Sequence, residues 1–99
     1  MDNKYVEKIK PQVLQVLKRH SNKLGIFGSF ATGEVKKRSD LDVLIEPKKE
    51  VSFFDLIRLE NELSKKIGRK VDLVTYNSVN HLLREIIFAE EVRIYEKRS

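Results

Sequence analysis

Residues 28–42 read GSFATGEVKKRSDLD and contain most of the candidate binding and catalytic residues of the chain. The stretch opens with a glycine and a serine, crosses the basic run 36–38, and closes with Asp40 and Asp42. Two carboxylates this close repel each other unless a positive charge lies beside them. The pair therefore indicates either a cation-binding site or a turn whose aspartates act as caps and pair with lysines.

The segments around this stretch predict a single α/β (α+β) domain. Four segments have the length and apolar content of strands, and the last of them alternates like a short edge strand: 24–28, 41–46, 71–76 and 92–96. Three segments have helical spacing: 11–20, 53–67 and 78–87. Ser78 is expected to cap the last helix. The predicted order is α-β-(short α)-β-α-β-α-β.

The helix predicted over 53–67 has the clearest start and stop signals. Ser52 and Asp55 have the spacing of a capping box, and Gly68 follows the last turn. Pro11 is expected to begin the first helix, because proline is favoured in the first turn and disfavoured further inside. The apolar residues expected to face the core are Val6, Ile9, Val13, Val16, Leu17, Phe53, Leu56, Leu59 (or Glu60), Leu63 and Ile67.

Composition excludes few functions, but it bears on the cellular compartment and on the kind of ligand. The 99 residues include 20 Lys and Arg against 15 Asp and Glu, a net charge of +5. This excess can attract phosphate-rich ligands, or it can simply keep the surface solvated. The chain has no cysteine, and it has neither a signal-peptide run nor the roughly 18 apolar residues of a membrane span. We expect one cytoplasmic domain, residues 1–99, without membrane contact.

The spacing of the aspartates predicts a metal site. Asp40 and Asp42 lie at the start of a predicted strand, and side chains two residues apart on a strand share a face. Oxygen ligands of this kind suit Mg²⁺ or Mn²⁺ rather than zinc. Asp72 interrupts another apolar strand, where an unpaired buried carboxylate would be costly. If the two strands are neighbours, Asp72 completes a cluster of three carboxylates; otherwise it pairs with a lysine.

Gly28 and Ser29 predict a small phosphate-binding turn in front of these carboxylates. Glycine lets a ligand approach the backbone, and serine offers a hydroxyl and an amide. The turn matches neither a P-loop nor a dinucleotide-binding fingerprint. Two metal ions held by such carboxylates can assist an in-line phosphoryl or nucleotidyl transfer. A carboxylate, for which Asp72 is our candidate, can accept the proton of the attacking hydroxyl.

The pattern of Gly-Ser, ten residues and Asp-x-Asp from 28 to 42 resembles the nucleotidyltransferase superfamily of DNA polymerase β. With the aspartate of KVDLVTY (70–76) and the segment FFDLIRLENELSKKIGRK (53–70), the resemblance covers about residues 10–96. It is greatest to the minimal nucleotidyltransferases, the MNT or MntA-like domains.

The resemblance implies a mixed sheet flanked by helices, with Gly28 and Ser29 binding the nucleotide phosphates. It implies Asp40, Asp42 and Asp72 as catalytic residues and as ligands of Mg²⁺, with two ions expected. It further implies transfer of AMP from ATP to an acceptor hydroxyl with release of pyrophosphate. Small MNT proteins are typically antitoxins of HEPN-domain toxins, and some adenylylate a tyrosine of the toxin.

The loop departs from the family pattern in one respect. Many relatives carry a basic residue near Ala31, where this chain has Phe30 and Thr32. The run 36–38 (KKR) is either a substitute for that residue or a solvated loop.

Two other functions remain open: an antitoxin that acts by binding alone, and a nucleic-acid-binding domain. The second is disfavoured because the basic residues are dispersed. The run Ile86–Phe88 is too apolar for one helix face to bury, so it is a candidate partner interface.

Overall fold

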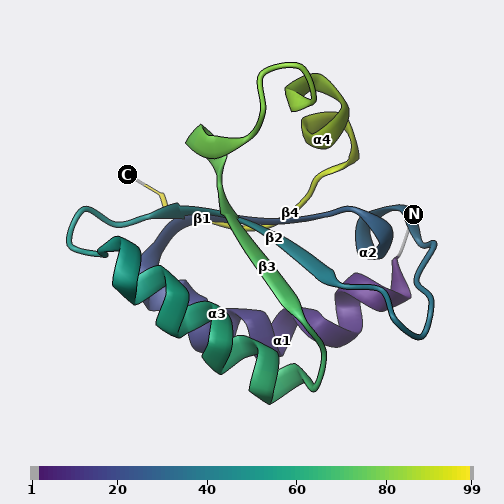
Figure 1. Cartoon of the computed structure of the whole chain (residues 1–99), viewed down its shortest axis with the longest axis horizontal. Helices are drawn as coiled ribbons and strands as arrows, with labels where there is room; N and C mark the ends of the chain where they lie inside the picture. Colours follow the sequence, from purple (N-terminus) through teal and green to yellow (C-terminus); the bar gives the residue numbers. More distant parts are fainter. Residues whose placement is uncertain (1–2, 99) are drawn as a thin grey trace.

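The computed structural model describes residues 3–98 and is built around a four-stranded sheet (Figure 1). Its strands are β1 (Ser21–Phe27), β2 (Leu41–Pro47), β3 (Val71–Thr75) and β4 (Val92–Glu96). Their order in space is β3-β2-β1-β4. β2 and β3 are parallel, whereas β1 is antiparallel to both β2 and β4. The mixed sheet, the edge position of β4 and the predicted order of elements are confirmed.

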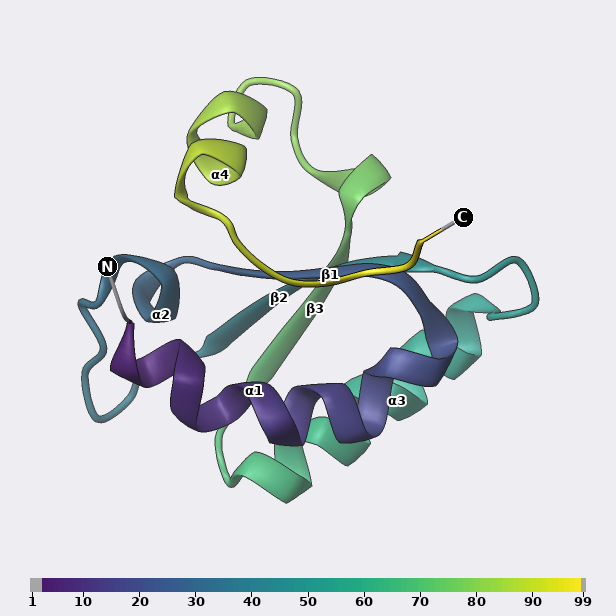
Figure 2. The same ribbon diagram turned by 180° about the vertical axis from the view of Figure 1, so that it is seen from behind.

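Two long helices cover one face of this sheet. α1 (Lys4–Leu17) and α3 (Phe53–Ile67) lie side by side beneath the strands in both views (Figures 1 and 2). The core between helices and sheet consists of buried apolar side chains: Val6, Ile9, Val13, Val16, Leu17, Leu24, Ile26, Phe30, Leu41, Val43, Ile45, Leu59, Leu63, Val71 and Ile94. Helical spacing thus predicted the α1 stripe completely.

α3 has the ends that the sequence predicts. The Ser52 hydroxyl accepts from the Asp55 amide at 3.1 Å, and the Ser52 amide donates to the Asp55 carboxylate at 2.9 Å. Gly68 ends the helix with φ +77°, in the left-handed region that favours glycine. Phe53 is different from the prediction: it is 72% exposed, because it lies in the first turn, ahead of the contact made through Leu59 and Leu63.

The prediction that the first helix begins at Pro11 is wrong. α1 begins at Lys4, where Asn3 Oδ1 accepts from the Tyr5 amide at 3.0 Å, and Pro11 lies inside the helix. Pro11 is exposed, so water can satisfy the carbonyl that its missing N–H leaves open. Burial of the stripe on both sides of Pro11 holds the helix together. The helix is followed by the 3₁₀ turn η1 (Lys18–His20) and directly by β1.

The prediction that Ser78 caps the last helix is also wrong. Ser78 belongs to the 3₁₀ turn η2 (Tyr76–Ser78), and its hydroxyl donates to the Thr75 carbonyl at 3.0 Å. α4 (Arg84–Glu90) begins only after a further loop, without a side-chain cap. No helix described within residues 3–98 is long and apolar enough to cross a membrane.

The second face of the sheet is only partly covered. η2, α4 and the loop between them rise on the side opposite α1 and α3 (Figure 2). On β2, Leu41 and Val43 belong to the core beneath the sheet, so Asp42 between them points to this second face. We call it the open face.

Candidate functional site

The three predicted aspartates lie at the same end of β2 and β3. Asp42 is the second residue of β2, Asp40 immediately precedes that strand, and Asp72 is the second residue of β3. Asp42 and Asp72 are paired Cα positions in the parallel β2–β3 register. Paired residues of neighbouring strands project to the same face, so both point to the open face. We call Asp40, Asp42 and Asp72 the site carboxylates. Their strands β2 and β3 are neighbours, which is the condition under which the sequence predicts a cluster of three.

The site carboxylates repel one another. Burial, followed by the charges of Asp72 and Asp40, raises the pKa of Asp42 from 3.8 to about 6. The nearby charge of Lys70 acts in the opposite direction and lowers the pKa. A site that holds several carboxylates against their own repulsion favours a cation.

One cation from the chain itself already lies at this site. Lys70 Nζ is 3.9 Å from Asp40 Oδ2 and 3.9 Å from Asp72 Oδ1, while its side chain is 70% exposed. Within residues 3–98, no three acidic or histidine side chains converge as they would around a bound metal ion. The oxygen donors and the shared attraction for one ammonium group nevertheless fit a hard divalent cation such as Mg²⁺.

Gly28 allows the phosphate-binding turn to approach these carboxylates. A Cβ atom added at Gly28 would lie 2.3 Å from Asp42 Oδ2, so no other residue fits without moving that carboxylate. The backbone of Gly28 has φ +71° and ψ −148°, a conformation that is essentially restricted to glycine. Ser29 follows as the first residue of the one-turn helix α2 (Ser29–Thr32). The structure therefore brings both ends of the 28–42 stretch together.

Arg69 organises the loop between α2 and β2, and sequence reasoning missed it. Its Nη1 atom donates to the carbonyls of Lys36 at 3.2 Å, Lys37 at 3.4 Å and Ser39 at 2.5 Å. Its guanidinium also lies 5.2 Å from the centroid of the buried Phe30 ring. The residue thereby fixes the backbone just ahead of the first site carboxylate. A separation of 30 residues between donor and acceptor leaves no local pattern in the sequence.

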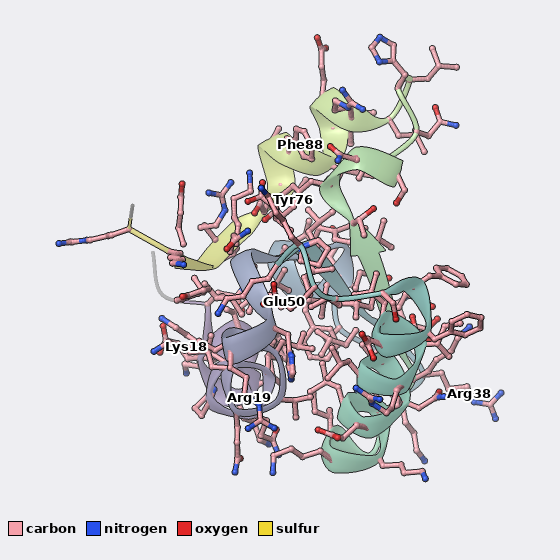
Figure 3. The ribbon with its side chains drawn as sticks, turned by 90° about the vertical axis from the view of Figure 1, so that its left-hand side faces the viewer. Lys18, Arg19, Arg38, Glu50, Tyr76 and Phe88 are labelled. Atoms are coloured by element: carbon pink, nitrogen blue, oxygen red, sulfur yellow. The ribbon has the colours of Figure 1, made fainter. Side chains whose placement is uncertain are left out.

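The basic run of this loop, residues 36–38, lies on the surface. Lys36, Lys37 and Arg38 are exposed, and Figure 3 shows Arg38 projecting away from the body of the protein. No hydrogen bond or ion pair joins these three side chains to a site carboxylate within residues 3–98. The solvated-loop interpretation fits this arrangement.

A second polar cluster on the open face ties the α4 region to the sheet. Glu91 Oε2 accepts from the Tyr76 hydroxyl at 2.5 Å and from Arg93 Nε at 2.8 Å. Figure 3 shows Tyr76 beside Phe88, and their ring centroids are 5.9 Å apart. Glu91 lies over Gly25 of β1, where any Cβ atom would collide with its carboxylate. These contacts join Tyr76, Phe88 and Arg93 to Glu91 or to one another on the open face.

The chain is similar to known proteins in sequence. Residues 8–99 match the family of polymerase β nucleotidyltransferases. A protein of Methanocaldococcus jannaschii named as a putative protein adenylyltransferase is 40% identical over 90 residues, which are 90% of this chain and 97% of that relative.

Two solved structures share the fold. One, described as a putative minimal nucleotidyltransferase, has a TM-score of 0.76 and 31% identity, covering 93% of this chain and 95% of the other. A chain from the complex of a tri-AMPylated Shewanella oneidensis HEPN toxin with an MNT antitoxin has a TM-score of 0.71, covering 92% of this chain and 72% of that one. Its identity of 15% shows likeness of fold alone.

Proposed function

The chain belongs to the polymerase β nucleotidyltransferase family, and we propose that it transfers AMP from ATP to a hydroxyl group of a partner protein. The observation that carries this proposal is the pairing of Asp42 with Asp72 across parallel strands, with Asp40 and Gly28 beside them. This arrangement supports an oxygen-rich cation site next to a turn that a phosphate can approach closely.

In this proposal the turn residues and the site carboxylates have different roles in one substitution at phosphorus. Gly28 and Ser29 hold the nucleotide phosphates, and Asp40, Asp42 and Asp72 hold two Mg²⁺ ions. When bound, the ions neutralise phosphate charge and align the attacking and leaving oxygens. The positive charge of the ions would offset the burial and the carboxylate repulsion that raise the pKa of Asp42.

Asp72 is our candidate for accepting the proton. It lies on β3, the edge strand, where an acceptor hydroxyl from another protein can reach it, whereas Asp42 lies between β1 and β3. The hydroxyl oxygen attacks the α-phosphorus of ATP, the bond to the β-phosphate oxygen breaks, and pyrophosphate leaves. The hydroxyl proton passes to the carboxylate, and AMP remains on the acceptor oxygen.

The proposed acceptor is a HEPN-domain toxin, for which this chain is the antitoxin. The named activity of the M. jannaschii relative supports protein adenylylation. The Shewanella complex, whose HEPN toxin carries AMP groups, supports the pairing, although this likeness is one of fold. We place the reaction in the cytoplasm and take residues 1–99 as one transferase domain that does not bind nucleic acid directly.

The test is transfer of label from α-³²P-ATP to a HEPN-domain protein that co-purifies with this chain. Wild-type protein with Mg²⁺ is expected to label that partner, and Asp42→Asn is expected to lower labelling at least 100-fold, as loss of an electrostatic transition-state contact does. Asp55→Asn is the matched control, because Asp55 lies in the capping box of α3, outside the site. Equal labelling by wild type and Asp42→Asn would overturn the assignment of the site.

The same variants separate enzymatic from purely structural neutralisation. If Asp42→Asn still binds the toxin but no longer suppresses its growth inhibition, neutralisation requires transfer. If it suppresses toxicity as well as wild type does, the alternative of an antitoxin acting by binding alone is correct.

A further inference from the structure

We propose that Lys70 is the phosphate-binding cation of this site, and that it acts as a displaceable counter-ion of Asp40 and Asp72 until metal and nucleotide bind. This inference rests on the proposed function and adds to it the basic residue that the phosphate-binding turn, residues 28–33, lacks. No pattern in the sequence assigns this role, since Lys70 lies far along the chain from the phosphate-binding turn.

The first argument is the position of the other basic groups. The turn has Phe30 and Thr32 where a basic residue was expected, and Arg38 projects away from the protein (Figure 3). Arg69 faces the loop, but its Nη1 atom is engaged by three backbone carbonyls. Among the ion pairs formed within residues 3–98, Lys70 provides the ones that reach the site carboxylates.

The second argument is that the Lys70 backbone is fixed while its side chain is not. The Lys70 carbonyl accepts from the Leu41 amide at 2.9 Å, which attaches it to the start of β2 between Asp40 and Asp42. The side chain is 70% exposed, and its two carboxylate contacts are long at 3.9 Å. Exposed ion pairs of this kind contribute at most about 1 kcal/mol, so Lys70 can release its partners readily.

These features predict two roles that follow one another. Without nucleotide, the Lys70 ammonium group partly neutralises Asp40 and Asp72, whose charges would otherwise repel that of Asp42. When divalent cations occupy the carboxylates, the ammonium group is displaced while the backbone holds it at the site. There it can pair with phosphate oxygens as a compact point charge.

Lys70→Met should therefore have opposite effects on two ligands. Nucleotide-free binding of Mn²⁺, followed by electron paramagnetic resonance, should become about threefold to fivefold tighter, because a competing cation is gone. Binding of α,β-methylene-ATP with Mg²⁺, measured by calorimetry, should become about tenfold weaker, because a charged hydrogen bond is lost.

The control is Lys66→Met, which removes the same charge from the exposed last turn of α3 and should change neither affinity. A variant that merely folds badly would weaken both ligands, so tighter Mn²⁺ binding distinguishes the proposed role from damage to the fold.

Two results would overturn the inference. If wild type binds both ligands and Lys70→Met binds them equally well, or binds both more weakly, Lys70 does not have this role and the proposed function stands. If wild type binds neither ligand, the proposed function fails and the role of Lys70 fails with it.

Discussion

The two faces of β2 differ in what they contribute to the protein. Leu41, Val43 and Ile45 are fully buried against α1 and α3, whereas Asp42 between them opens to the other side. One strand thus supplies hydrophobic stabilisation on one face and a charged site on the other. Core packing and the charged site can therefore be changed separately in this small domain, because they depend on alternate residues of the same strand.

The ionised Asp42 carboxylate on the open face lowers the stability of the folded protein. The pKa of Asp42 is raised to about 6, first by burial and then by its two carboxylate neighbours, so its ionised form is disfavoured in the folded protein. Retention of such strained charges is common at functional sites and uncommon elsewhere. Removal of the Asp42 charge should therefore raise stability, whereas truncation of an apolar side chain on the covered face should lower it.

The largest effect is expected on the covered face. Leu63 is 0% exposed, so Leu63→Ala should lower the free energy of unfolding by about 3 kcal/mol, through lost burial and the cavity that remains. Leu82→Ala is the matched control, because Leu82 is 86% exposed, and it should change that free energy by less than about 0.5 kcal/mol. Urea unfolding followed by circular dichroism measures both; equal losses would contradict the division between faces.

A smaller effect is expected where the phosphate-binding turn meets the open face. Gly28→Ala should destabilise the protein by about 2 kcal/mol and displace the Asp42 carboxylate, because the new Cβ would lie 2.3 Å from Asp42 Oδ2. Gly33→Ala also imposes a positive φ, but no heavy atom lies within 4 Å of its Cβ position. It should cost about 1 kcal/mol and leave Mn²⁺ affinity unchanged. Unaltered Mn²⁺ affinity in Gly28→Ala would refute the close approach.

Substitution of Arg69 tests whether cation binding requires a fixed loop between α2 and β2. Arg69→Ala should lower stability by roughly 1 kcal/mol, because water replaces the guanidinium at exposed carbonyls. It should also weaken Mn²⁺ binding, since the backbone before Asp40 becomes mobile. Arg58→Ala, which removes only an exposed pair with Asp55, should leave Mn²⁺ binding unchanged. Identical Mn²⁺ affinities in the two variants would show that Arg69 does not position the site.

The covered face could be predicted from the sequence, because its signals are local. Helical spacing in α1 and the capping box of Ser52 and Asp55 each depend on residues within a few positions of one another. Local rules failed where packing outweighed them. Pro11 lies inside α1 because burial on both sides continues the helix, and Ser78 forms a separate turn.

The open face could be predicted only in part. The spacing of Asp40 and Asp42 and the apolar surroundings of Asp72 identified the three carboxylates, and the parallel pairing of their strands confirms that Asp42 and Asp72 lie together. The contacts of Arg69 with the loop and of Lys70 with Asp40 were not predictable. They join segments about 30 residues apart, and they form only once β2 and β3 are side by side. The pair of Lys70 with Asp72 is local, and it is the lysine pair that the sequence left open for Asp72.

The most direct test of the account is the difference in unfolding free energy between Asp42→Asn and wild type, measured in urea without divalent cations from pH 4 to pH 7.5. Because the folded-state pKa of about 6 lies above the ordinary 3.8, Asp42 favours folding fully below about pH 4 and loses that contribution as the pH rises through 6.

The account predicts that Asp42→Asn is more stable than wild type by about 1 kcal/mol at pH 7.5, allowing for solvent screening of a half-exposed group, and that this advantage disappears near pH 4. A variant that is less stable than wild type at pH 7.5, or an advantage that grows as the pH falls, would contradict the claim that the open face holds the Asp42 carboxylate against the cost of burial and the repulsion of its neighbours.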